Sequence, residues 1–398
     1  MNDNDGIIIA GAGPVGLVAA LRLNAFGIRC TVIEQCETLP SDLRASTFHP
    51  PTLDMLDGYG LTEPLIRQGL ICPTWQVRWH DTGEHVLFDL SLLKGETSHP
   101  YRLQCEQSRL CRLLLERLQH AEGVELLFGA TFDSFAQDED GVTVQATHHG
   151  EALELRGSFL IGADGAKSRV RELLGLPFEG RTYPETTILA TTPFPFEQHL
   201  SALSNVNYVW WERGTFSLLK LPTVWRCSLY PDDGEAVEDA SRLENIQRKL
   251  QRIVPTGRDY DVRDSRPYRV HMRIVEDYRR GRVVLAGDAA HINSPSGGMG
   301  MNGGIHDAFS LTDALRQIRD GGPLELLDRY TRRRRAIAES EVLAQADRNR
   351  ARMQERDPMR RRALFDELRQ TAEDPKLARE HLLRSSMIAG LRRAEAIA

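Results

Sequence analysis

The chain has 398 residues, a length that exceeds one ordinary domain and predicts two or three. Hydrophobic residues make up 41% and charged residues 27%, which is the composition of a globular protein. The formal net charge of −6 gives no bias toward nucleic acid or an anionic membrane surface. An arginine run at 332–335 is flanked by acidic residues, so we interpret it as a solvated helix face rather than a phosphate-binding patch.

The cysteines and the N-terminus indicate where the protein acts. The six cysteines form no Cys-x-x-Cys pair and no His/Cys spacing suggests zinc, so we expect reduced thiols and no metal site. The first residues lack the basic region of a signal peptide. The apolar run at 7–20 is interrupted by glycines and a proline, and it is too short to span a bilayer. We therefore expect a cytoplasmic protein, monomeric or homodimeric, with no membrane or nucleic-acid partner.

The first part of the chain has the pattern of a βαβ unit. Ile7 to Ala10 is a short apolar run closed by glycines, as in a buried parallel strand. Residues 15–26 have helical spacing and end before Gly27, where a helix stop belongs. Residues 30–34 indicate a second strand, which completes the unit within about thirty residues.

The remaining elements alternate between α/β and β-rich segments. We expect a hairpin over 75–93, a helix over 108–121, strands over 124–128, 142–147, 159–161, 207–211, 217–221, 226–230 and 282–286, a helix over 304–319, and helices from there to the end. The fold class is therefore α/β, with a Rossmann-like dinucleotide-binding domain, an interleaved β-rich substrate domain and a helical C-terminus. The expected boundaries are 1–74, 100–176 and 277–345 for the dinucleotide domain, 75–99 and 177–276 for the substrate domain, and 346–398 for the C-terminal helices.

The turn after the first strand carries a dinucleotide fingerprint, Gly11-Ala12-Gly13-Pro14-Val15-Gly16. Its glycines suit a tight turn, close approach of a pyrophosphate, and close packing of helix on strand. The phosphates then meet the free N–H groups of the helix N-terminus. Glu34 lies 18 residues past Gly16, at the end of the next strand, where a carboxylate can accept ribose hydroxyls. This fingerprint predicts dinucleotide binding without separating FAD from NAD.

Three further motifs follow in order: the segments 160–171 (Leu-Ile-Gly-Ala-Asp-Gly-Ala-Lys-Ser-Arg-Val-Arg), 283–291 (Val-Val-Leu-Ala-Gly-Asp-Ala-Ala-His) and 294–304, a glycine-rich loop that opens a helix. With the fingerprint, they make the chain resemble the class A flavoprotein monooxygenases, the p-hydroxybenzoate hydroxylase-like family. The resemblance covers about residues 6–345, and the insert at 177–271 matches only loosely.

The resemblance implies an activity and its cofactors. The family fold implies non-covalently bound FAD, with NADH or NADPH as a transient reductant that has no Rossmann domain of its own. It implies hydroxylation of a small aromatic substrate, expected to be phenolic, with O2 through a flavin C4a-hydroperoxide. Residues 346–398 leave no room for the thioredoxin-like third domain of larger phenol hydroxylases.

The resemblance also assigns cofactor-binding positions. The implied residues are Gly11, Gly13, Pro14, Val15 and Gly16 for the pyrophosphate, Glu34 for the adenosine ribose, Arg44 closing over the cofactor, Gln104 and Arg109 along the ribityl chain and phosphates, Asp164, Gly287 and Asp288 in the two Asp-containing motifs, and Pro295, Gly298, Gly300, Met301 and Asn302 around the flavin pyrimidine. Elementary chemistry supports the last group. Reduced flavin carries negative charge around N1 and C2=O, and the first N–H groups of a helix can stabilise it. The alternative for this segment is an ordinary glycine-rich connector.

Substrate contacts are expected in the β-rich insert. Tyr208 lies five residues before Arg213-Gly214, a register that resembles the substrate-contacting tyrosine of p-hydroxybenzoate hydroxylase. Leu219 and Leu221 fall near the serine and arginine that hold the benzoate carboxylate in that enzyme, and leucines cannot pair with a buried carboxylate. We therefore expect Leu219, Leu221 and Pro295 to line an apolar pocket beside Tyr208, with Arg226 the remaining candidate for a substrate anion.

Some conspicuous residues have simpler interpretations. We interpret His291 as a packing or capping residue, and Trp210, Trp211 and Trp225 as packing residues rather than substrate stackers. Two alternative functions stay open: a same-fold epoxidase or N-hydroxylase, and a non-catalytic FAD- or ligand-binding protein. The Trp-x-Trp-x-Ile-Pro motif of flavin halogenases is absent from the sequence.

Overall fold

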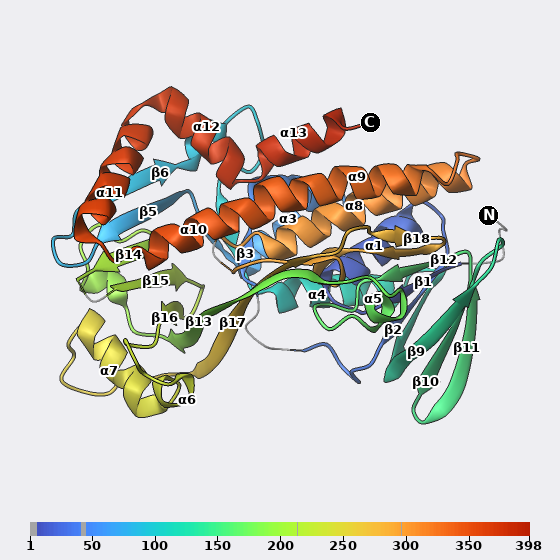
Figure 1. Ribbon diagram of the computed structural model, residues 1–398, viewed down its shortest axis with the longest axis horizontal. Helices are drawn as coiled ribbons and strands as arrows, with labels where there is room; N and C mark the ends of the chain where they lie inside the picture. The colour runs from blue at the N-terminus through green and yellow to red at the C-terminus, as the bar shows by residue number, and fades with distance from the viewer. Residues whose placement is uncertain (1–5, 41–44, 213, 296) are drawn as a thin grey trace.

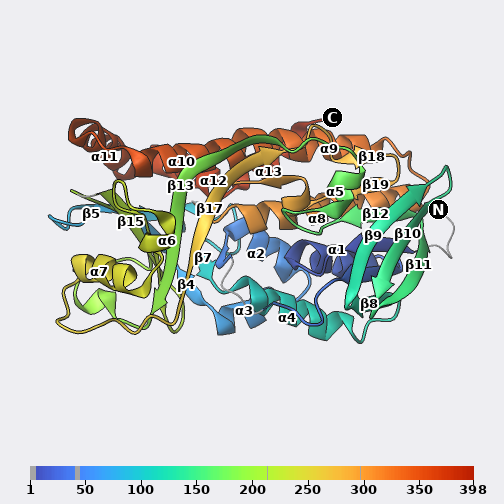
Figure 2. The same cartoon turned by 60° about the horizontal axis from the view of Figure 1, so that its bottom comes forward.

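The computed structural model describes residues 6–40, 45–212, 214–295 and 297–398. A six-stranded sheet occupies one end of the molecule and an eight-stranded sheet the other (Figure 1). Long helices from the C-terminal third run along one side and span both ends (Figures 1 and 2).

The six-stranded sheet has the expected Rossmann-like core. Its order is β18 (Arg279–Arg280), β19 (Val283–Leu285), β12 (Phe159–Gly162), β1 (Ile7–Ala10), β2 (Cys30–Glu34) and β8 (Val124–Phe128). All neighbours are parallel except β18 and β19. Strands β1, β12 and β19 are buried along their whole length, which explains their unbroken apolar sequences.

The eight-stranded sheet gathers segments that lie far apart in the sequence. Its order is β20 (His291–Ile292), β17 (Asp264–Ile274), β13 (Glu179–Thr192), β16 (Trp225–Leu229), β15 (Gly214–Lys220), β14 (Val206–Trp211), β5 (Thr74–Trp79) and β6 (His85–Asp89). The β5–β6 hairpin joins it through a parallel pairing in which Val77 lies opposite Tyr208. Long strands β13 and β17 run from this sheet toward the six-stranded one (Figure 2).

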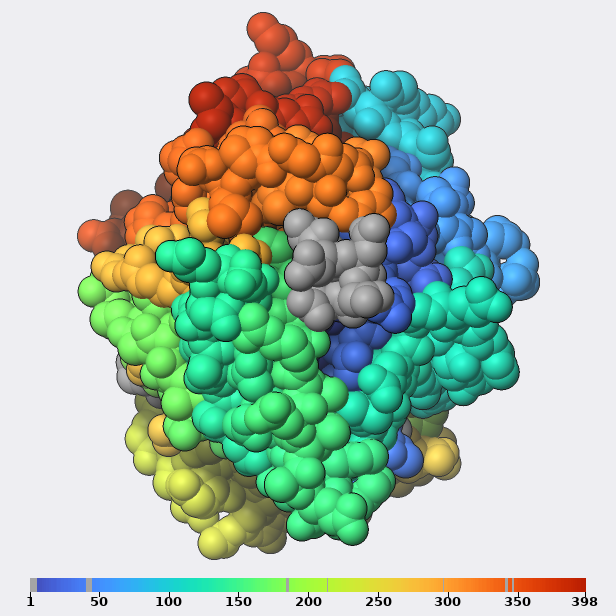
Figure 3. All heavy atoms as spheres, turned by 90° about the vertical axis from the view of Figure 1, so that its right-hand side faces the viewer, coloured from blue at the N-terminus to red at the C-terminus, as the bar shows by residue number. Residues whose placement is uncertain are grey.

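Two smaller sheets complete the β-structure. Strands β9 (Ala130–Gln137), β10 (Val142–His148) and β11 (Glu151–Gly157) form an antiparallel sheet, and they lie at the surface of the end viewed in Figure 3. Strands β3 (Thr47–Phe48), β7 (Arg102–Gln104) and β4 (Leu70–Cys72) form the other. In the second sheet Gln104 pairs with both Thr47 and Leu70, so the segment after β2 is held against the strand that precedes α4.

Helices cover the sheets and form the C-terminal third. In chain order they are α1 (Pro14–Ala25), α2 (Pro50–Asp57), α3 (Thr62–Gln68), α4 (Gln107–Leu118), α5 (Arg169–Leu173), α6 (Val237–Ala240), α7 (Leu243–Ile253), α8 (Gly300–Arg319), α9 (Leu326–Ile337), α10 (Ala344–Gln354), α11 (Pro358–Glu373), α12 (Pro375–Ser385) and α13 (Ile388–Ala396). A π-helical segment (Ala338–Leu343) joins α9 to α10, so the two form one long rod (Figure 1). Helices α11 and α12 turn back toward β5 and β6 (Figure 1).

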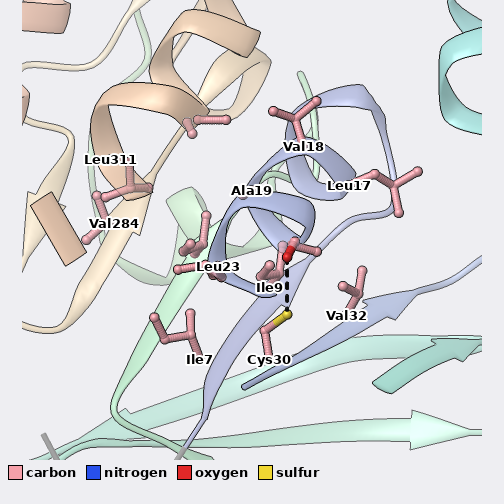
Figure 4. Close-up of a cluster of buried hydrophobic side chains, with 14 of the residues drawn as sticks. Ile7, Ile9, Leu17, Val18, Ala19, Leu23, Cys30, Val32, Val284 and Leu311 are labelled. Atoms are coloured by element: carbon pink, nitrogen blue, oxygen red, sulfur yellow. Dashed lines mark hydrogen bonds between the residues drawn. The ribbon is translucent and has the colours of Figure 1, made fainter. Parts of the chain in front are cut away.

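The largest hydrophobic core lies between the six-stranded sheet and helices α1 and α8. Figure 4 shows Ile7 and Ile9 of β1 beneath Leu23 of α1, with Val284 and Leu311 closing the core from the far side. Each of these five side chains is fully buried. Burial of such side chains stabilises the fold by about 1.5–3 kcal/mol each, so the core fixes where the turn after β1 lies.

Most of the elements expected from the sequence are confirmed, with local corrections. The helix expected over 304–319 begins at Gly300, so Gly300, Met301 and Asn302 form its first turn rather than a preceding loop. The pattern also missed β9, β11 and the full lengths of β13 and β17. These strands carry many exposed polar side chains, and their apolar signal is correspondingly weak.

One buried carboxylate joins four segments of this fold. Asp307 of α8 is fully buried and accepts from the Gly287 N–H (3.1 Å), His291 Nε2 (2.7 Å) and Arg334 Nε of α9 (2.6 Å). Burial alone raises the pKa of Asp307, but Arg334 and His291 outweigh it and lower the pKa to about 2. His291 is therefore a packing residue held by an ion pair, in agreement with its sequence interpretation.

We predict that Asp307→Asn lowers the free energy of unfolding by about 3–5 kcal/mol, because it leaves the buried Arg334 cation without a counter-ion. Urea denaturation measures the change, with Asp140→Asn on the exposed surface as the control. The Asp307 pKa is depressed in the folded state, so its stabilisation is complete above the unfolded pKa and is lost as the pH falls toward about 2. The Asp307→Asn variant should lack this acid-dependent part of the free energy of unfolding. If the Asp307→Asn variant has the wild-type free energy of unfolding, the ion pair between Asp307 and Arg334 does not stabilise the fold.

Candidate active site

The turn between β1 and α1 has the shape that its glycines predict. Gly11 has φ 105°, and a Cβ there would clash with the backbone at Ala163. A Cβ at Gly16 would overlap the Gly11 carbonyl, so this glycine allows α1 to pack on the turn. Gly13 faces open space and lies at the N-cap of α1, which has no capping side chain and no acidic residue in its first turn. The first N–H groups of α1 therefore face the space beside Gly13 as an anion site.

Glu34 lies at the carboxyl end of β2, beside the same turn. Its two carboxylate oxygens accept the backbone N–H groups of Ala12 (2.9 Å) and Cys36 (3.0 Å). These contacts fix the carboxylate at the rim of the phosphate turn, where it retains lone pairs for further donors.

Asp164 follows β12, the strand next to β1. Its Oδ2 accepts the Val170 N–H (3.1 Å), whereas Oδ1 is buried without a hydrogen-bond partner among the described residues. Burial raises the pKa of this carboxyl above its ordinary value. A buried acceptor without a partner is costly, and a hydroxyl or amide donated by a ligand would satisfy it.

The motif around Gly287 packs directly on the phosphate turn. Cβ atoms added at Gly287 or Gly304 would both collide with the Val15 side chain. The three glycine-bearing segments thus meet at the start of α1. Asp288 is exposed at this junction, and burial together with the Asp288 carboxylate raises the pKa of Tyr268 on β17 to about 12.

The loop before α8 is held in place by Asn302. This buried side chain donates to the carbonyls of Thr47 (2.8 Å) and Gly298 (2.7 Å) and accepts the His49 N–H (2.9 Å). Gly298 packs so closely on Thr47 that a Cβ would clash. No side chain caps α8 and its first turn has no acidic residue, so its N–H donors are available to an anion.

The other expected cofactor residues have varied surroundings. Gln104 is buried and exchanges hydrogen bonds with Thr47. Arg109 is 40% exposed and pairs with Glu106 (3.3 Å). Pro295 is exposed on the glycine loop. Arg44 lies outside the described residues.

A cavity lies beside the glycine loop. Its walls come from β5, β7, β14, the loop before α8, α10 and α12. The lining residues are Trp75, Val77, Arg102, Tyr208, Gly297, Met299, Gln345, Asn349, Arg352, Met353, His381 and Ser385. The cavity joins the β-rich sheet, the glycine loop and the C-terminal helices.

Tyr208 is the expected substrate residue that this cavity contains. It lies edge-on to Trp75, with ring centroids 6.0 Å apart. Leu219 packs in the same hydrophobic cluster, but Leu219 and Leu221 are not among the residues that line the cavity. Arg226 lies elsewhere and donates to Ser46 Oγ (3.0 Å). Among the expected packing residues, Trp210 and Trp225 are fully buried.

Three ionisable cavity residues escaped the sequence interpretation: Arg102, Arg352 and His381. Arg102 precedes Gln104 by two residues, so strand alternation places both side chains on one face of β7. That signal could have identified it. Arg352 and His381 come from C-terminal helices whose docking leaves no local pattern. Burial lowers the pKa of His381 to about 4, and Arg352, Arg384 and Arg102 add to the effect.

The structure also bears on two other features, a membrane-spanning helix and a metal site. Within the described ranges, no helix combines the length and apolar character needed to cross a membrane. Over the same residues, no group of three or more histidine, cysteine, aspartate or glutamate side chains could hold a metal ion.

The chain is similar in sequence to known proteins. The family described as FAD binding domain matches residues 5–345. Para-nitrophenol 4-monooxygenase from Pseudomonas sp. (strain WBC-3) is 33% identical over 366 residues, which cover 91% of this chain and 90% of that protein. The 6-hydroxy-3-succinoylpyridine 3-monooxygenase of Pseudomonas putida is 34% identical, covering 83% of this chain and 84% of its own.

Solved structures agree with the sequence relatives. The crystal structure of p-nitrophenol 4-monooxygenase from Pseudomonas putida superposes with a TM-score of 0.90 at 31% identity, covering 97% of this chain and 98% of that one. Aklavinone-11 hydroxylase, solved with FAD and aklavinone, gives a TM-score of 0.78 at 26% identity over 89% of this chain and 70% of its own. The chain therefore belongs to the class A FAD-dependent monooxygenases, the NAD(P)H-using flavoproteins that hydroxylate aromatic rings.

Proposed function

We propose that this monooxygenase hydroxylates a small phenol inside the cavity between Tyr208 and the glycine loop. The observation that carries the proposal is the lining, which combines the aromatic side chains of Trp75 and Tyr208 with Gly297 and Met299 of the loop. Aromatic walls suit a ring substrate, and a few polar groups suffice to orient it. The p-nitrophenol monooxygenases, which cover nearly the whole chain, favour a phenol of similar size.

The residues around the phosphate turn fit FAD. Gly13 leaves open space at the uncapped start of α1 for a pyrophosphate, and Gly11, Pro14, Val15 and Gly16 shape that turn. Glu34 at its rim suits a ribose. The partnerless Oδ1 of Asp164 and the exposed carboxylate of Asp288 suit the hydroxyls of a cofactor.

The loop before α8 suits the flavin ring. Gly300 and Met301 present backbone N–H groups at the start of α8, the Gly298 N–H donates to the Pro295 carbonyl (3.0 Å), and Asn302 holds that backbone in place. Donors fixed in this way stabilise negative charge without reorganisation. The bound cofactor supplies the oxygen chemistry, while this chain holds the substrate ring, orients it and excludes water.

Tyr208 is the residue that we assign to the phenolic oxygen. Its side chain lies at the cavity wall, and a hydrogen bond from its hydroxyl would fix which ring carbon faces the glycine loop. We place the enzyme's action in the cytoplasm, a compartment that keeps cysteines reduced, as the described cysteines are. Incubating purified protein with FAD, NADH or NADPH, and a phenol panel in air tests the proposal. Consumption of reductant without any hydroxylated phenol would reject it.

We predict that Asp288→Ala weakens FAD binding by about 1–3 kcal/mol, because cofactor hydroxyls lose their acceptor. Titration of apoprotein with FAD, followed by flavin fluorescence, measures the change. Asp233→Ala, which removes an equally exposed carboxylate, serves as the control. Equal FAD affinity in both variants would remove Asp288 from the cofactor site.

We predict that Tyr208→Phe retains FAD and reductant oxidation but lowers the yield of hydroxylated product, with hydrogen peroxide formed in its place. The ring still fills the wall, whereas the hydrogen bond that orients the phenol is lost. The measurement is the ratio of product to NAD(P)H consumed. Tyr59→Phe, which removes a hydroxyl bonded to Arg22 outside the cavity, should keep the wild-type ratio. A wild-type ratio in the Tyr208 variant contradicts the assignment.

A further inference from the structure

Arg102 is a buried cation that has no counter-ion among the residues that the structure describes. Its side chain lies on β7 in the cavity wall and is 4% exposed. Its Nε has no hydrogen-bond partner among the residues that the structure describes. The other buried arginines all donate hydrogen bonds; they are Arg22, Arg78, Arg171, Arg226, Arg334 and Arg361. Since an unpaired buried charge is strongly unfavourable, Arg102 has the character of a ligand-binding group.

Neighbouring aromatic rings hold Arg102 in place without neutralising it. Its guanidinium lies 5.3 Å from the centre of the Trp75 ring, and Trp75 stacks on Phe88 at 4.4 Å. A cation–π contact orients a guanidinium, but it leaves the N–H donors available. The donors of Arg102 are therefore positioned for an acceptor within the cavity.

A second arginine, on a different element, lines the same cavity. Arg352 projects from α10, and no ion pair links it to a carboxylate among the described residues. Among the described residues, the lining contains no aspartate or glutamate. Burial lowers the pKa of Arg352, with Glu367 acting in the opposite direction. Two cations and no anion give the cavity a positive potential.

The two imidazoles in this region are neutral at neutral pH. His381 stacks on Phe88 (4.6 Å), and burial with Arg352, Arg384 and Arg102 lowers its pKa to about 4. Burial and Arg102 also lower the pKa of His49, behind the loop, to about 3. Neither imidazole can hold a proton taken from a phenol, because each has a pKa far below neutrality. Tyr208 is the other ionisable group of the lining.

From these contacts we propose that the cavity binds its substrate as a phenolate, with the oxyanion held by Arg102 and Arg352. This inference rests on the proposed phenol hydroxylase function and specifies its substrate class. The class is phenols that ionise near or below neutral pH, such as those with nitro or halogen substituents. An ionised oxygen makes the ring more electron-rich, which electrophilic hydroxylation requires. The proton is lost to water before binding, so no base in the cavity is needed.

The test compares equilibrium binding of 4-nitrophenol and nitrobenzene to the FAD-loaded protein, followed by the change in flavin absorbance. The two probes share a ring and a nitro group, and only one ionises. In the wild type, 4-nitrophenol should bind more tightly, and its affinity should increase as pH rises through its ionisation. Arg102→Met should weaken 4-nitrophenol binding by about 10- to 100-fold and remove this pH dependence. Nitrobenzene binding and FAD content should stay unchanged.

Matched variants separate the outcomes. Arg67→Met, which removes a surface arginine of α3, should bind both probes as the wild type does. Arg352→Met should weaken 4-nitrophenol selectively, and it provides the same test if Arg102→Met does not fold. Equal weakening of both probes, or loss of FAD in Arg102→Met and Arg102→Lys alike, would overturn the proposal. If the wild type hydroxylates phenols and both Arg102→Met and Arg352→Met keep full selectivity for 4-nitrophenol, the phenolate inference is wrong and the proposed function stands. If the wild type hydroxylates no phenol, the proposed function fails.

Discussion

The arrangement of this protein depends on one buried carboxylate. Asp307 holds the Gly287 N–H, His291 and Arg334 at once, and thereby joins α8, α9 and the two turns that follow β19. An acceptor inside a low-dielectric core requires satisfied donors in a fixed geometry. Because Asp307 fixes these segments, Gly287 and Gly304 are held against Val15 at the start of α1. The segments assigned to the cofactor therefore meet as parts of one rigid unit.

The cofactor side and the substrate side are built on different physical principles. The cofactor side uses backbone groups: close glycine contacts, uncapped helix ends, and carboxylates at strand ends. The substrate side uses side chains that project from two sheets and from helices α10 and α12. Backbone recognition requires glycines at set positions, whereas the cavity accepts varied side chains. Family members can thus share FAD while their substrates differ.

Charge distinguishes this cavity from the rest of the interior. Elsewhere each buried cation of the described residues donates hydrogen bonds, as Arg334 does to Asp307 and Lys249 to Glu235. In the cavity, Arg102 and Arg352 face aromatic rings and neutral imidazoles, with no carboxylate in the lining. Low polarity strengthens the attraction of such cations for an anion. The aromatic rings supply contact area for a substrate ring, and the cations supply its orientation.

The sequence by itself determined the Rossmann-like fold, the dinucleotide fingerprint and the family, because those features depend on local patterns. Examples are the apolar run of β1, the spacing of Gly11 to Gly16, and Glu34 at the end of β2. It also predicted that Tyr208 belongs to the β-rich insert, where the structure places it in the cavity wall. It did not reveal that Arg102, Arg352 and His381 line one cavity, nor that Leu219 and Leu221 lie outside the lining. Those relations arise from the docking of α10 and α12 across a sheet whose strands come from distant segments. Such docking follows from the packing of whole surfaces, which no short window of sequence records.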